Sequence, residues 1–220
     1  MPTHRHVTLF HSPDTRSFGA LLLLEELNAD HELHVLNMKA GEQRGAAYLA
    51  VNPMGKVPAV RHGDALVTEQ AAVFMYLADL YPEAGLAPAI GDPLRGPYLR
   101  WRVTYGSCFE PAVVDRAMKR EPAPASTSPY GDFDTMLATL TGQLARGPYR
   151  LGDRFSAADV LWGTALTWTT MFKLVPELPL LADYMARVNA RPAMARARAR
   201  DAALAAAQPA PPAGSPPAKA

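Results

Sequence analysis

The sequence predicts a small α/β domain followed by an all-helical domain. Through residue 82, strand and helix patterns follow one another in the order β-α-β-α-β-β-α. From Asp92 onward the strand patterns disappear and only helical periodicity remains. The stretch 81–93 between them is rich in proline and glycine, as domain boundaries commonly are. We therefore expect domains at 1–82 and 94–206, joined by a linker at 83–93.

The first domain alternates β-rich runs with helical patterns. Short apolar or alternating runs predict strands, and these lie at 7–10, 32–36, 56–60 and 65–68. Gly63 and Asp64 separate the last two runs and favour a hairpin turn. Helices are expected at 17–27, at 41–52 as a short weak one, and around 73–80, where apolar residues have helical spacing.

The second domain opens with a strong helix-start signal. Asp92 is a candidate N-cap, and Pro93 suits the first helical position. Pro111 is expected to break or kink this helix, because proline lacks a backbone N–H and its ring crowds the preceding turn. The proline-rich segment 119–129 is expected to form a loop.

Further helices follow that loop. Ser156 and Asp159 have the spacing of a capping box. Apolar periodicity predicts other helices at 133–144 and 181–188, and an alanine- and arginine-rich solvated helix follows residue 192. The last segment, 207–220, has too few large apolar residues to pack and is expected to be disordered.

Composition narrows the class of protein. The 220 residues are 49% hydrophobic and carry 22 basic against 21 acidic side chains, so no basic excess favours nucleic acid. The first residues have no signal-peptide pattern, and no run reaches the roughly 18 apolar residues of a membrane helix. Cys108 is the only cysteine, which excludes an internal disulfide and a thiol-rich metal site. We expect a soluble, cytoplasmic protein without membrane, nucleic-acid or metal partners.

The turn HSPDTRSFG, residues 11–19, joins the first strand to the first helix and concentrates hydroxyl groups. Ser12, Thr15 and Ser17 either cap the helix or form one wall of an active site. A helix N-terminus lowers the pKa of a thiol held near it, and a hydroxyl that donates a hydrogen bond to the thiolate adds to this.

Two further segments suggest ligand contacts. Pro58 stands at the mouth of a strand and is a candidate for a cis peptide bond. The backbone of Val57 is then available to pair with a peptide-like ligand, although a purely structural proline is the alternative. Glu69 opens the next helix, where it either binds an ammonium group or complements the helix dipole behind a Thr68 cap.

Four segments in this order and spacing resemble the glutathione transferase family. They are LFHSPDTRSFGALLLLEEL, LAVNPMGKVPAV, VTEQAAVFMYLADLYP and LGDRFSAADVLWG, and the resemblance covers nearly the whole chain. It implies a thioredoxin-like first domain, an all-helical second domain, a homodimer, and glutathione as co-substrate.

The resemblance also assigns roles to residues of the glutathione site. It implies that the backbone of Val57, before Pro58, pairs with the cysteinyl part of glutathione, and that Glu69 and Gln70 hold the γ-glutamyl end. The family commonly has serine where Gln70 stands. Lys39 and Lys56 are the candidate partners of the glycyl carboxylate.

The thiol-activating residue departs most from the family pattern. Some members have a tyrosine near the position of His11, and others have serine or cysteine where Asp14, Thr15 and Arg16 stand here. The hydroxyl candidates are therefore Ser12, Thr15 and Ser17, of which Ser12 and Thr15 are favoured. Arg16 either favours the ionised thiol or forms a surface salt bridge. Because this turn has no cysteine, thiolate stabilisation is favoured over a mixed disulfide.

The family builds an apolar pocket for a small hydrophobic electrophile between its domains. Here the candidate residues are His11, Tyr105, Cys108 and Phe109, although aromatic residues at helical spacing are more often core. The leading hypothesis is an enzyme that directs the glutathione thiolate at an electrophilic carbon, with possible peroxidase activity, as in detoxification. The alternatives are a non-catalytic binding or interaction module of the same fold and, third, a protein that stores or transports ligands.

Overall fold

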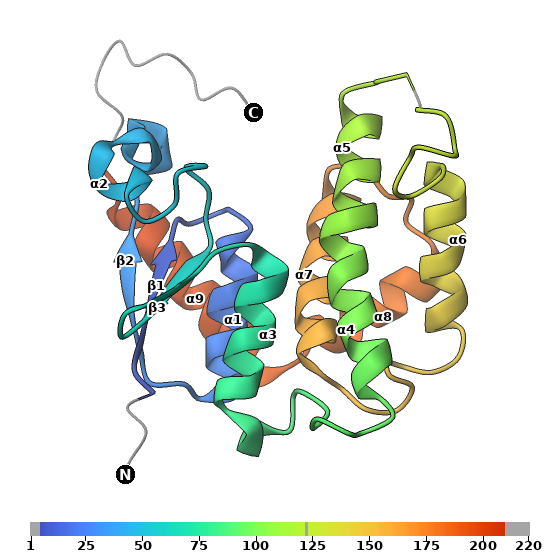
Figure 1. Ribbon diagram of the computed structural model, residues 1–220, viewed down its shortest axis with the longest axis horizontal. Coiled ribbons are helices and arrows are strands. Elements are labelled where there is room, and N and C mark those ends of the chain that lie inside the picture. Colours follow the sequence, from blue (N-terminus) through green and yellow to red (C-terminus); the bar gives the residue numbers. More distant parts are fainter. Residues whose placement is uncertain (1–4, 122, 210–220) are drawn as a thin grey trace. The chain divides into compact units, whose positions relative to one another are not determined.

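The computed structural model describes residues 5–121 and 123–209, which form two compact units (Figure 1). One unit holds the chain up to Leu80 and again from Pro192 onward, and the other holds Tyr81–Arg191. The predicted division into an α/β part and a helical part is confirmed. Most of the predicted disordered tail, residues 210–220, lies outside the described residues.

A mixed four-stranded sheet forms the centre of the first unit. The strands are β1 Val7–His11, β2 His31–Val35, β3 Ala59–His62 and β4 Ala65–Val67, in the spatial order β2-β1-β3-β4. β1 is parallel to β2 and antiparallel to β3, and β3 and β4 form the predicted hairpin. Gly63 supplies the positive φ of +55° that the hairpin turn requires.

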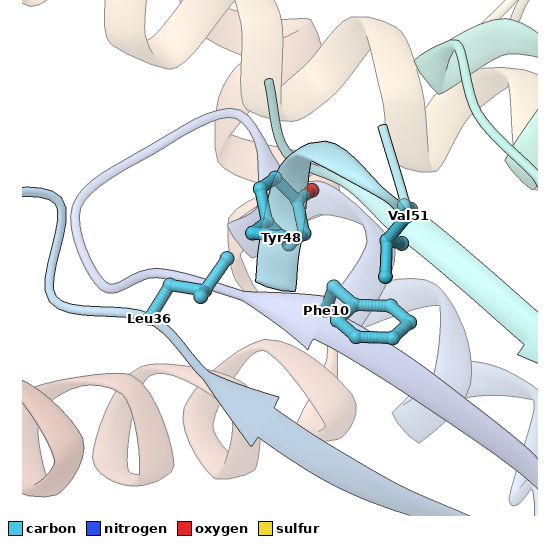
Figure 2. Packing of buried hydrophobic residues seen from close by; sticks show 5 residues of the cluster. Phe10, Leu36, Tyr48 and Val51 are labelled. Atoms are coloured by element: carbon cyan, nitrogen blue, oxygen red, sulfur yellow. The ribbon is translucent and has the colours of Figure 1, made fainter. Parts of the chain in front are cut away.

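Side-chain alternation along β1 separates the two faces of the sheet. Phe10 packs with Leu36, Tyr48, Val51 and Ala59 on the face covered by α2, Ala46–Leu49 (Figure 2). His11, the next residue, therefore points to the opposite face. Helices α1, Ser17–Leu27, and α3, Gln70–Leu80, pack beside each other in this unit. Two short 3₁₀ helices also lie in the described part of this unit, η1 Met38–Ala40 and η2 Glu42–Arg44. Another, η3 Pro82–Ala84, opens the second unit.

The C-terminal helix α9, Pro192–Ala207, belongs to the first unit and packs on α1, whereas the sequence analysis assigned it to the helical domain. Its buried face is built mainly from Ala193, Met194 and Ala197. Small residues of this kind leave only a weak apolar pattern in a sequence, which explains the difference. Gln208 and Pro209 are placed too, so the predicted disorder does not begin at residue 207.

In the described residues of the second unit, helices are the regular secondary structure apart from isolated bridges near residue 150. Its helices are α4 Arg95–Thr104, the π-helical turn η4 Tyr105–Phe109, α5 Glu110–Ala117, α6 Phe133–Leu144, α7 Ala157–Met171 and α8 Pro179–Asn189. The first helix begins at Arg95, later than predicted, because Asp92 accepts the Leu94 N–H in a preceding turn. Ser156 and Asp159 form the predicted capping box of α7.

Of the two predicted effects of Pro111, a break or a kink, the break does not occur, because the chain continues from α4 through η4 into α5. The π turn lies directly before the proline, and Glu110 donates its N–H to the carbonyl of Tyr105 five residues earlier. A wider turn of this kind accommodates a residue that has no N–H to donate and a ring that crowds the preceding carbonyl.

Gly163→Ala is expected to destabilise the helical unit by about 1–3 kcal/mol, because its Cβ has no room. That atom would lie 2.5 Å from Cγ1 of Val188, so α7 and α8 must move apart. Urea denaturation measures the effect. Gly142→Ala on α6 is the matched control, since nothing lies within 4 Å of its Cβ; the better helix propensity of alanine should stabilise it by up to about 1 kcal/mol. Equal stability of the two variants would argue against the close approach.

Candidate functional site

The predicted site segments of the first unit meet at the carboxyl end of β1. Phe10 pairs with Ala59 across the antiparallel strands, so Ser12 and Val57, each two residues beyond this pair, extend from the same end of the two strands. Leu36 donates its backbone N–H to the carbonyl of His11 at 2.8 Å. The Gln70 side chain donates Nε2–H to the carbonyl of Arg16 at 3.1 Å and so attaches the start of α3 to the same turn.

The bond between Val57 and Pro58 is cis, so the structure confirms this candidate cis peptide bond. The preceding carbonyl, of Lys56, accepts hydrogen bonds from the Tyr48 hydroxyl at 2.6 Å and from Asn52 Nδ2 at 2.9 Å. Among the described residues, none hydrogen-bonds the backbone N–H or carbonyl of Val57. The Lys56 carbonyl is therefore held by two donors, whereas the Val57 backbone keeps its own hydrogen-bonding groups unused within the described residues.

Tyr48→Phe tests the role of this hydroxyl and is expected to cost about 1 kcal/mol of stability at neutral pH, the usual value of one hydrogen bond. Burial raises the pKa of Tyr48 to about 12. Since this folded-state pKa exceeds the ordinary value of 10.0, the contribution is complete below pH 10 and is lost as the pH rises towards 12. Urea denaturation at increasing pH should therefore show the wild type losing its advantage over the variant.

Tyr76→Phe is the control for that series, because its hydroxyl instead contacts His62 Nδ1 at 2.6 Å, away from the Lys56 carbonyl. A difference for Tyr48→Phe that stays constant from neutral to strongly alkaline pH would contradict the prediction.

The hydroxyl turn forms a dense hydrogen-bond network. Thr15 Oγ1 donates to the carbonyl of Ser12 at 2.7 Å, and Ser17 Oγ donates to the same carbonyl at 3.0 Å. The two hydroxyls lie 2.8 Å apart. Ser17 Oγ also accepts the Ser12 backbone N–H at 3.1 Å and lies 2.9 Å from His11 Nδ1.

The three hydroxyl candidates differ in accessibility. Ser17 is fully buried and Ser12 is 3% exposed, whereas Thr15 is half-buried and reaches the surface. The Ser17 oxygen is surrounded by four polar neighbours, all from the hydroxyl turn and the end of β1. Thr15 is therefore the most exposed of the three residues.

His11 is fully buried, contrary to its predicted place in the electrophile pocket. Its Nε2 lies 2.8 Å from Oδ1 of Asp201 on α9, and the other carboxylate oxygen accepts the backbone N–H of Asp14 at 3.2 Å. The sequence analysis did not identify Asp201 as part of the site. The available signal was that Asp201 is the single acidic residue of α9.

The charged candidates are all at the surface. Glu69 has a φ of +63°, an uncommon conformation for a residue other than glycine, which often marks a functional site. Arg16 and Glu69 are exposed. Lys39 and Lys56 are exposed as well, and the described chain offers neither ammonium group an acidic partner within ion-pair distance.

The electrophile-pocket candidates of the second unit lie mostly in its core. Tyr105 and Phe109 are 4% and 1% exposed and pack against Trp162. The Tyr105 hydroxyl donates to Glu110 at 2.9 Å. Cys108 is half-buried, and its thiol donates to the carbonyl of Pro129 at 3.3 Å. Tyr105 and Phe109 are therefore core residues, which is the alternative that the sequence analysis left open.

Residues 5–121 and 123–209 lack two features that other classes of protein have. No three histidine, cysteine or acidic side chains there gather in a group that could bind a metal ion. None of the helices in the same ranges combines the length and apolar character needed to span a membrane.

Comparisons with protein families match both parts of the chain. The model of the glutathione S-transferase N-terminal domain matches residues 5–79, and that of the C-terminal domain matches residues 118–192. Glutathione S-transferase GstA of Escherichia coli O157:H7 is 28% identical over 187 residues, covering 84% of this chain and 93% of the relative. Glutathione S-transferase PARB of Nicotiana tabacum is 29% identical over 196 residues, covering 83% and 91%.

Solved structures give the same result. A glutathione transferase from Methylococcus capsulatus has a TM-score of 0.75 and 31% identity, covering 90% of this chain and 99% of its own. A sphingomonad glutathione S-transferase complexed with glutathione has a TM-score of 0.72 and 30% identity, covering 89% and 98%.

Proposed function

This chain belongs to the glutathione S-transferase family, and from that premise we propose that it binds glutathione and transfers its thiol to an electrophile. The observation that carries the proposal is the Val57 backbone, whose hydrogen-bonding groups are unused within the described residues, at the same end of the sheet as the hydroxyl turn. The relatives are named as transferases, which favours catalysis over a non-catalytic binding module.

In the proposed complex, the cysteinyl part of glutathione pairs with the Val57 backbone as an added strand does. Glu69 binds the γ-glutamyl ammonium group. Gln70 uses one amide N–H for the Arg16 carbonyl and has a second one for the γ-glutamyl carboxylate. Lys39 and Lys56 provide positive charge for the glycyl carboxylate.

We assign thiolate stabilisation to Thr15. The Ser17 N–H fixes the Thr15 oxygen at 3.2 Å. The carbonyl of Ser12 has two hydroxyl donors, so Thr15 can turn its proton toward a thiolate while Ser17 continues to satisfy that carbonyl. The N-terminus of α1 and the Arg16 cation add positive potential. The thiol loses its proton to solvent, and its sulfur then attacks the electrophilic carbon and expels the leaving group.

The proposal extends to the second substrate, the assembly and the place of action. We propose a small apolar electrophile, a role in detoxification, a homodimer and a cytoplasmic location. These four points rest on family membership alone.

The test is an ultraviolet difference titration of glutathione with the purified protein, which follows thiolate absorbance against pH. We expect the thiol to ionise well below its free pKa of about 8.5, and an activated aryl halide to be conjugated in the same buffer. Binding without ionisation would reduce the protein to a glutathione-holding module. Absence of binding would refute the proposed function.

A further inference from the structure

The end of the described chain hydrogen-bonds the loop that carries Lys39. Gln208 donates its side-chain Nε2–H to the carbonyl of Leu36 at 3.0 Å. In the opposite direction, Asn37 donates Nδ2–H to the carbonyl of Pro209 at 3.0 Å. Two reciprocal bonds therefore connect segments that are 172 residues apart in sequence.

Asn37 is the residue that organises this loop. It is 5% exposed, and its Oδ1 accepts the backbone N–H of Ala40 at 3.1 Å, which caps η1. Its own N–H donates to Oε2 of Glu42 at 2.7 Å. Because Lys39 is the middle residue of η1, the orientation of the Asn37 amide determines where the Lys39 backbone lies.

Helix α9 positions Gln208 and Pro209 beside the loop that carries Lys39. Arg196 binds Glu25 of α1 at 2.9 Å, and Asp201 contacts the hydroxyl turn. The helix then ends at Ala207, and in Figure 1 its carboxyl end reaches the region of α2. The residues that follow are thus held at the end of β2 by the packing of the whole helix, rather than by their own two bonds alone.

We propose that Gln208 and Pro209 are positioning residues for glutathione, which hold the Lys39 loop where its ammonium group can bind the glycyl carboxylate. This inference rests on the proposed function and specifies which part of the ligand the C-terminal segment serves. Neither residue touches the reacting sulfur. Their loss therefore weakens binding of the glycyl end and leaves the chemical step unchanged.

The test compares glutathione with γ-glutamylcysteine, which is glutathione without its glycine. Gln208→Ala is expected to raise KM for glutathione about fivefold, the effect of one lost hydrogen bond. Its kcat should change less than about twofold, because the sulfur environment is intact. KM for γ-glutamylcysteine should stay at the wild-type value, since that thiol has no glycyl carboxylate.

Gln143→Ala is the matched control. Its Nε2 donates to the carbonyl of Arg150 at 3.0 Å in the helical unit, so it loses the same kind of bond away from the loop. Deleting residues 208–220 removes both reciprocal bonds and gives a second variant, whose KM for glutathione should rise further. In Lys39→Gln, the additional effect of Gln208→Ala should vanish, because two residues that act through one contact are not additive.

The possible outcomes distinguish failure of the proposed function from failure of the positioning role of Gln208 and Pro209. If the unaltered protein binds neither thiol, the proposed function fails, and the positioning role fails with it. If the protein binds both thiols, an equal rise in KM for both in Gln208→Ala and in the truncated chain overturns the positioning role alone. Unchanged KM values in both variants overturn it as well.

Discussion

Thr15→Ala is expected to lower kcat/KM for glutathione conjugation by about 100-fold, the loss typical when one donor to a developing anion is removed. The pKa of the bound glutathione thiol should rise towards its free value at the same time, because the hydroxyl stabilises only the ionised form. The measurements are initial rates with an activated aryl halide and the ultraviolet thiolate titration, each repeated on the variant.

Thr15→Ser keeps the hydroxyl and should retain activity within about tenfold, since only a methyl group is lost. Thr139→Ala is the control for removal of a threonine hydroxyl, because Thr139 Oγ1 donates to the carbonyl of Thr135 on α6. Ser17→Ala should act mainly on stability. Near-normal thiolate formation in Thr15→Ala, together with its loss in Ser12→Ala, would transfer the role to Ser12.

The fold was largely predictable because its elements have strong local signals. The four strands are short β-rich runs, and their hairpin has a glycine at the turn. The capping box at Ser156 was predicted from spacing alone. Pro58, directly before β3, was a candidate for the cis bond because cis peptide bonds occur almost only before proline.

The site was less predictable where residues distant in sequence meet. His11 and Asp201 contact each other but are 190 positions apart in the sequence, and no local pattern links them. Helix α9 lacks the large apolar residues that would indicate a packed face. Likewise, spacing on a helix could not tell whether Tyr105 and Phe109 line a surface or surround Trp162.

These differences between the predicted and the observed surroundings of site residues share a physical cause. Local sequence determines backbone conformation, but the partner of a buried polar group depends on which helix covers it. Asp201 illustrates the consequence, because one carboxylate contacts both the His11 ring and the backbone of the hydroxyl turn. The geometry around Thr15 is therefore maintained in part by the last helix of the chain.

Asp159→Ala is expected to destabilise the helical unit by about 3–5 kcal/mol, because it leaves buried hydrogen-bond donors without an acceptor and a buried arginine without its nearby negative charge. The Asp159 carboxylate accepts the backbone N–H groups of Ser156 at 2.9 Å and Arg150 at 2.8 Å, and the Tyr184 hydroxyl at 3.0 Å. Burial raises the pKa of Asp159 and lowers the pKa of Arg150, so both ions carry a desolvation cost that their attraction offsets.

Removing the carboxylate leaves the Arg150 guanidinium buried with its positive charge unbalanced, stacked on Trp101 and Trp162. Urea denaturation followed by tryptophan fluorescence measures the loss directly, since all three tryptophans, Trp101, Trp162 and Trp168, belong to this unit. Asp132→Ala is the matched control. Asp132 caps α6 through the Thr135 N–H at 2.7 Å but is solvent-exposed, so its loss should cost only about 1 kcal/mol. Equal losses for the two variants would mean that Asp159 acts as an ordinary cap. A much larger loss for Asp159 than for Asp132 would instead show that the buried interactions of its carboxylate, and not ordinary capping, stabilise the start of α7.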